Sequence, residues 1–137
     1  MITYELAKKL KESGFSQELE NGDWGYCVDC GENSEIHLAH HDNDEGNFVG
    51  NDYSHHLGEK WKNSGHNTLI KIPTLSELIE ACGDRFNILN RMKNEEQQIF
   101  WVCNAFWEIG NNKVIWESRG DTPEEVVAKL WLKINKK

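Results

Sequence analysis

The sequence lacks positive charge over a long stretch: between Lys11 and Lys60 it contains no lysine or arginine. The same stretch, residues 12–59, contains twelve acidic residues, within a chain whose formal net charge is −8. Such a surface repels phosphate, and we expect no direct nucleic-acid binding through it. It suits a basic protein partner or a cation, or it serves solubility alone.

Long apolar runs and targeting signals are also missing. No apolar run is long enough to cross a bilayer. The amino-terminal stretch MITYELAKKLKESGF has neither the apolar core of a signal peptide nor a small-residue cleavage site. We therefore expect a cytoplasmic protein without membrane association, in which the four cysteines are thiols or metal ligands rather than disulfides.

Motifs of the common enzyme classes are absent as well. The chain has no P-loop, no G-x-G-x-x-G, no H-E-x-x-H and no G-x-S-x-G. Cys82 and Cys103 fall inside expected regular elements, where free cysteines behave as small buried hydrophobic residues. We therefore expect a non-enzymatic protein and no catalytic residue, with an enzyme of unassignable class as an alternative.

The 137 residues that are present indicate one domain, residues 1–137, with the acidic, histidine-rich segment 12–59 inside it. A chain of this length buries about two-thirds of its unfolded surface, so it needs neither a disulfide nor a metal to fold. No cofactor is therefore expected for folding.

Apolar periodicity and capping residues predict three helices. Thr74 with Glu77, and Thr122 with Glu125, have the spacing of capping boxes, and Gly83 is placed to end the middle helix. The helices are expected at about 3–13, 74–90 and 122–135.

Alternating apolar residues predict two hairpins, at about 99–118 around Gly110 and at about 24–40. Both faces of the first hairpin are apolar, which indicates that it lies inside the domain. The expected fold class is α+β, a small antiparallel sheet packed with helices.

Several of these stretches resemble a known family. ELAKKLKESGF, PTLSELIEACG, the pair Phe86 and Leu89, and TPEEVVAKLWLK together look like a family of small proteins encoded by phages and prophages. The resemblance covers residues 1–15 and 73–135 and implies a bacterial host cell, but no mechanism, because that family has no assigned activity. A weaker likeness links the hairpin and the GDTPEE helix to HicB-type antitoxins.

The stretch CVDCGENSEIHLAHH permits a zinc site. Cys27 and Cys30 have knuckle spacing, and His37 with His40 or His41 supplies further ligands. The six residues between Cys30 and His37 are fewer than a zinc finger uses. In a strand, residues 27 and 30 face opposite ways, so the strand and the zinc site exclude each other, and the strand is favoured.

The stretch DNDEGN, residues 42–47, has two aspartates spaced as in a calcium-binding loop. An EF-hand loop beginning at Asp42 requires glycine at its sixth position and glutamate at its twelfth, where Asn47 and Tyr53 stand. A solvated turn is the favoured interpretation.

The acidic segment is the expected interaction surface. Binding is assigned to its carboxylates and to two tryptophans, since tryptophan is favoured at interface hot spots. The residues are Asp42, Asp44, Glu45, Asp52, Trp24 and Trp61. We expect a phage or prophage accessory protein that binds a basic protein, as an inhibitor of a host defence or nucleic-acid-binding protein.

Overall fold

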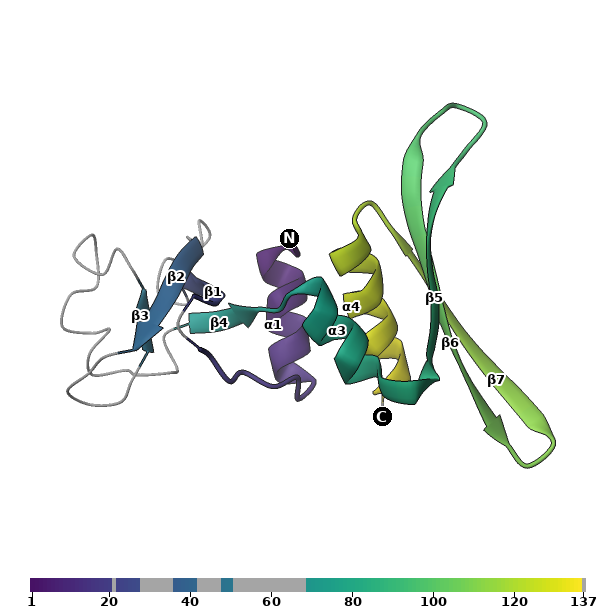
Figure 1. The fold of residues 1–137 in the computed structure, drawn as a ribbon, viewed down its shortest axis with the longest axis horizontal. Helices are drawn as coiled ribbons and strands as arrows, with labels where there is room; N and C mark the ends of the chain where they lie inside the picture. The colour runs from purple at the N-terminus through teal and green to yellow at the C-terminus, as the bar shows by residue number, and fades with distance from the viewer. Residues whose placement is uncertain (21, 28–35, 42–47, 51–68, 137) are drawn as a thin grey trace. The chain divides into compact units, whose positions relative to one another are not determined.

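The structure is a computed structural model that describes residues 1–20, 22–27, 36–41, 48–50 and 69–136. These residues form an α+β fold with two antiparallel sheets (Figure 1), which confirms the predicted fold class. The elements are α1 (Tyr4–Glu12), β1 (Trp24–Cys27), β2 (Ile36–His41), β3 (Phe48–Gly50), β4 (Leu69–Ile72), α3 (Leu75–Cys82), the 3₁₀ helix η3 (Gly83–Arg85), β5 (Phe86–Lys93), β6 (Ile99–Ile109), β7 (Asn112–Gly120) and α4 (Pro123–Ile134).

The chain divides into two compact units. Unit 1 comprises Met1–Leu6 and Thr74–Lys137, and unit 2 comprises Ala7–Pro73. The acidic segment 12–59 belongs to unit 2. That residues 1–137 form a single domain stays a prediction, because it depends on how the two units are joined.

Unit 2 contains the sheet β3-β2-β1-β4. Strands β1 and β2 pair antiparallel, with Gly25 opposite His37, which confirms the hairpin predicted at about 24–40. Strand β1 also pairs with β4, and there a Cβ on Gly25 would lie 3.1 Å from the Leu69 Cβ. Glycine at this position therefore lets the two strands approach closely.

The second segment of unit 1, which starts at Thr74, begins with α3. The Thr74 side chain accepts from the Glu77 N–H at 3.2 Å, and the Glu77 carboxylate accepts from the Thr74 N–H at 3.3 Å, as the predicted capping box requires. The helix ends at Cys82, because the next residue, Gly83, has a φ of 66°.

The predicted helix at about 74–90 is wrong beyond Cys82. After η3, residues Phe86–Lys93 form strand β5, which pairs antiparallel with β6. Phe86 and Leu89, expected as a helical turn, lie opposite Ala105 and Cys103 instead. Pairing with a long neighbouring strand outweighs the weak local preference of a short apolar pattern for helix.

Strands β5, β6 and β7 form a three-stranded antiparallel sheet in that order. The hairpin predicted at about 99–118 is confirmed as β6 and β7. Its turn is Gly110–Asn111, and Gly110 has a φ of 61°. A positive φ confined to the first turn residue is the type II′ pattern that suits the twist of a hairpin.

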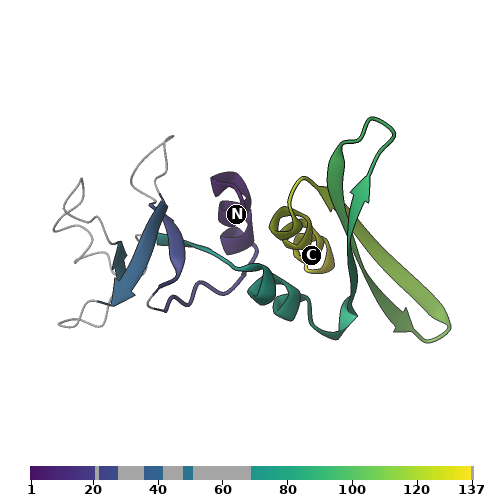
Figure 2. The same cartoon turned by 45° about the horizontal axis from the view of Figure 1, so that its top comes forward.

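Helix α4 packs on one face of this sheet, and Figures 1 and 2 show α3 and α4 on the same side of it. The core of unit 1 is made by side chains from both helices and from β6, namely Leu78, Cys103, Ala105, Val126, Val127 and Leu130. The predicted helices at about 3–13 and 122–135 are confirmed as α1 and α4.

The expectation that both faces of the β6–β7 hairpin are buried is wrong. Cys103 and Ala105 face the helices and are fully buried, whereas Phe106 and Ile115, opposite each other on the other face, are 36% and 62% exposed. Two short helices cover only one face of a three-stranded sheet. The face that carries Phe106 and Ile115 is covered by neither of these two helices, and we call it the outer face of the sheet.

Candidate functional site

The predicted partner-binding residues are only partly covered by the structure. Asp42, Asp44, Glu45, Asp52 and Trp61 lie outside the described residues. The sixth, Trp24, is the first residue of β1 and is 44% exposed. It is therefore accessible to a partner on unit 2.

The zinc hypothesis is also only partly covered. Cys27 is the last residue of β1, so the favoured strand is present over 24–27, and Cys30 lies outside the described residues. His37 and His40 belong to β2. No cluster of three or more His, Cys, Asp or Glu side chains able to hold a metal occurs within the described ranges. Zinc binding stays the alternative interpretation that the sequence left open.

The described end of the acidic segment runs along β4. The Lys71 N–H donates to the Gln17 Oε1 at 3.0 Å, and the Lys71 ammonium donates to the Glu18 carbonyl oxygen at 2.7 Å. Asp23 accepts from the Glu20 N–H at 2.9 Å and forms an ion pair with Lys71. These bonds fix the backbone that carries Glu18, Glu20 and Asp23.

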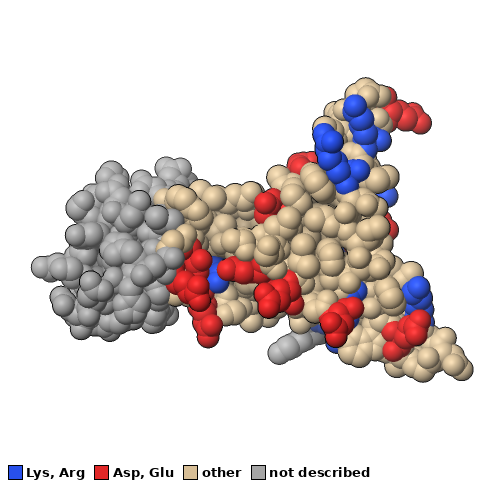
Figure 3. Space-filling view, in the orientation of Figure 1, with Lys and Arg blue, Asp and Glu red and all other residues tan. Residues whose placement is uncertain are grey.

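Two of these carboxylates remain exposed. The Glu18 and Glu20 backbones make the contacts just described, and both residues are exposed to solvent. No lysine or arginine pairs with either carboxylate among the described residues. Asp and Glu side chains stand out from the described surface in Figure 3. We call the four residues Glu18, Glu20, Asp23 and Trp24 the acidic patch; Trp24 directly follows Asp23 in the chain.

Cys82 and Cys103, the two cysteines whose side chains the structure describes, are not nucleophiles. Cys82 and Cys103 are buried and free. Burial raises the pKa of Cys82 to about 11 and that of Cys103 to about 12. The Cys103 thiol donates to the Val126 carbonyl oxygen at 3.3 Å. Both therefore stay protonated at neutral pH and act as packing residues, as the sequence predicted.

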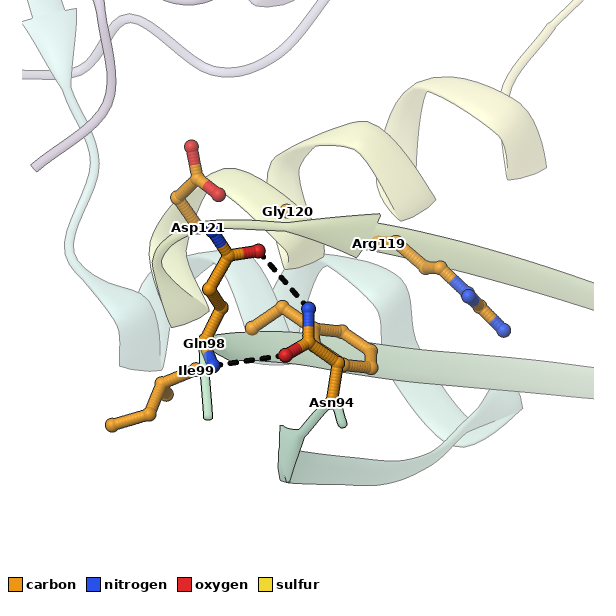
Figure 4. Close-up of a pocket in the computed structure, with 7 residues that line it drawn as sticks. Asn94, Gln98, Ile99, Arg119, Gly120 and Asp121 are labelled. Carbon is orange, nitrogen blue, oxygen red and sulfur yellow. Dashed lines mark hydrogen bonds between the residues drawn. The ribbon is translucent and has the colours of Figure 1, made fainter. Parts of the chain in front are cut away.

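A shallow depression lies between the β5–β6 turn and the end of β7 (Figure 4). The Asn94 and Gln98 side-chain amides bond to each other at 3.0 Å, and Asn94 Oδ1 accepts from the Gln98 N–H at 2.9 Å. Figure 4 shows Arg119 and Asp121, the charged residues of this site, pointing away from this pair in different directions. Because the charged groups do not converge, the depression has no acid–base or nucleophilic arrangement.

A second depression lies beside η3. Its main feature is the Arg85 guanidinium, 3.6 Å from the centroid of the Trp107 ring. Asp84 and Glu108 also line it. This cation–π contact occupies both the guanidinium and the ring face, so it holds the end of η3 against β6.

Sequence reasoning missed one further feature, the outer face of the β5–β6–β7 sheet. It exposes Ile88, Met92, Phe106 and Ile115 beside Lys113, whose ammonium lies 4.6 Å from the Phe106 ring centroid. The alternation of Lys113, Ile115 and Glu117 along one strand face was the available signal.

Comparisons of the chain with protein-family models, with curated proteins and with solved structures give no match. The resemblances to the phage family and to HicB-type antitoxins therefore stay predictions. Within the described parts of the chain, none of the helices is both long and apolar enough to cross a bilayer.

Proposed function

We propose that this protein acts by binding a basic protein through the acidic segment 12–59, with the acidic patch as its described end. The observation that carries the proposal is the state of Lys71, the one basic residue described between 12 and 73. Its ammonium is already engaged by Asp23 and by the Glu18 carbonyl, and only 10% of its side chain is exposed. The carboxylates of Glu18 and Glu20 are therefore not neutralised by a described basic residue.

Uncompensated carboxylates beside an exposed tryptophan match a partner that presents lysines and arginines around an apolar pocket. Charge of one sign raises the association rate, and an aromatic anchor supplies affinity once the surfaces meet. Proteins with a nucleic-acid-binding groove have such surfaces, because the groove must attract phosphate. With the phage-like stretches of the sequence, this supports an inhibitor of a host defence or nucleic-acid-binding protein.

Affinity capture from a bacterial lysate tests the proposal. Immobilised wild-type protein is expected to retain a basic partner at about 0.1 M salt and to release it at about 1 M, where the Debye length falls from about 10 Å to about 3 Å. Trp24→Ala is expected to weaken retention already at the lower salt concentration, because it removes apolar contact while leaving the charge unchanged. Absence of any retained basic protein at low salt would overturn the proposal.

A further inference from the structure

The three-stranded sheet of unit 1 has two different edges. Strand β7, nine residues from Asn112 to Gly120, pairs with β6 without a register shift and contains no proline. Strand β5 at the other edge has a register shift between Phe86 and Ile88. Among the devices that keep edge strands from pairing with another chain, which also include charged side chains, are bulges and prolines. The β7 edge has neither.

The register shows which backbone groups of β7 point outward. The two-residue turn Gly110–Asn111 is closed by the pair Ile109 and Asn112. Hydrogen-bonded pairs alternate along an antiparallel ladder, so the even-numbered residues of β7 bond to β6. The odd-numbered residues therefore turn their N–H and C=O groups toward the free edge. The Lys133 ammonium donates to the carbonyl oxygen of an odd-numbered residue, Glu117, which agrees with this assignment.

The β7 sequence is complementary to itself. In an antiparallel pair of two β7 strands centred on Ile115, Lys113 of each copy lies opposite Glu117 of the other. Ile115, 62% exposed, lies opposite Ile115, and Val114 lies opposite Trp116. Opposite charges and apolar side chains in directly opposed positions each stabilise an antiparallel pair.

We propose that two copies of this chain pair through β7, antiparallel and centred on Ile115, to form a continuous six-stranded sheet. The neighbouring registers are less favourable. Centring on Trp116 places Lys113 opposite Arg119, which is a like-charge pair, and centring on Val114 places Lys113 opposite Ile115.

Existing contacts at this edge are compatible with the pairing. Glu117 forms an ion pair with Arg119 at 3.6 Å in which both side chains are more than half exposed, so this pair is weak and leaves Glu117 available. The Glu117 carbonyl oxygen, which accepts from Lys133, has a second lone pair for the new ladder bond.

Sedimentation equilibrium of the full-length chain tests the pairing. The wild type is expected to sediment at twice its 15.9 kDa mass. Lys113→Glu and Glu117→Lys each place like charges opposite each other twice, and each is expected to raise the dimer dissociation constant by about tenfold or more. The double variant Lys113→Glu/Glu117→Lys restores both opposite-charge pairs and is expected to restore the dimer. Lys93→Glu, on the β5 edge, serves as the matched control and is expected to leave the dissociation constant unchanged.

A crosslink tests the register independently of charge. In a Cys27→Ser/Cys30→Ser background, Ile115→Cys is expected to form an interchain disulfide on mild oxidation, because directly opposed residues lie within disulfide range. Asn111→Cys is expected to form none, since the two copies of that residue would lie about 27 Å apart at about 3.4 Å per residue.

A monomeric wild type at about 1 mM would overturn the proposal. So would a dimer that the single charge variants leave intact, that the double variant fails to restore, or in which Ile115→Cys does not crosslink, because the copies would then meet through another surface or another register.

Discussion

Lys71 and Asp23 form an ion pair with 3.6 Å between Nζ and Oδ2, in which 10% of the lysine side chain and 21% of the aspartate side chain are exposed. The same ammonium donates to the Glu18 carbonyl oxygen. One lysine thus holds Glu18 and Asp23 against β4 and is itself covered. This arrangement keeps the backbone of the acidic patch in place while leaving its outer carboxylates without a described basic partner.

Loss of this lysine is expected to destabilise unit 2. Lys71→Met removes a charged hydrogen bond and leaves Asp23 without its counter-charge, which lowers the free energy of unfolding by about 1–3 kcal/mol. Lys129→Met is the matched control: its ion pair with Glu125 joins side chains that are 42% and 27% exposed, and its loss costs about 0.5 kcal/mol or less. Urea denaturation of the three proteins measures both values. Equal losses would contradict the role given to Lys71.

The decrease in stability at acidic pH is expected to depend on Glu125. The side-chain hydrogen bond from Lys129 is the main cause that lowers the pKa of this carboxyl below 4.5, and the Asp121 and Thr122 contacts lower it further. A folded-state pKa below the unfolded value contributes stability above about pH 4.5, which is lost as the pH falls through the folded pKa.

Glu125→Gln removes this titration. Thermal melting between neutral pH and pH 3 is therefore expected to show a shallower loss of stability on acidification in the variant than in the wild type. If the variant and the wild type lose the same stability on acidification, the titration of Glu125 makes no contribution to the pH dependence of stability.

Gln97 is the one non-glycine residue with positive φ in the described residues, at 66°, in the turn between β5 and β6. A left-handed conformation costs a non-glycine residue about 1–2 kcal/mol. Glycine avoids this cost, but it loses more backbone entropy on folding, which cancels part of the gain in stability. Gln97→Gly is expected to raise the free energy of unfolding by up to about 1 kcal/mol. The converse change in the other turn, Gly110→Ala at a φ of 61°, is expected to lower it. A decrease for Gln97→Gly would contradict the assignment of strain to this turn.

The buried thiols are expected to be unreactive in the folded protein. With pKa values of about 11 and about 12, Cys82 and Cys103 carry almost no thiolate at neutral pH, and burial also excludes a reagent. Alkylation followed by peptide mapping is expected to modify neither residue until denaturant unfolds unit 1. Rapid labelling of Cys103 in the native protein would show that β6 opens locally.

Local signals in the sequence predicted much of this fold. Thr74 with Glu77, and Thr122 with Glu125, specify helix starts by hydrogen bonding within four residues, and Gly110 specifies a hairpin turn, so none of them depends on distant parts of the chain.

What escaped prediction depends on distant pairing. Phe86–Lys93 has an apolar pattern compatible with a helix, and only its pairing with β6 makes it a strand. Both faces of the hairpin at about 99–118 are apolar, which predicted that both are buried, and the exposure of Phe106 and Ile115 follows from the number of helices available to cover the sheet. Of the candidate site, the exposure of Trp24 is consistent with its predicted role, and Lys71 was missed because its partners lie about fifty residues away.

The most direct test of the proposed function compares two charge reversals of equal size. Glu18→Lys/Glu20→Lys changes two carboxylates of the acidic patch whose side chains make no described contact, and Glu95→Lys/Glu96→Lys changes two exposed carboxylates in the β5–β6 turn. In capture at about 0.1 M salt, the first variant is expected to lose the basic partner that wild type retains, and the second is expected to keep it. Equal retention by both variants would contradict the acidic patch as the binding surface.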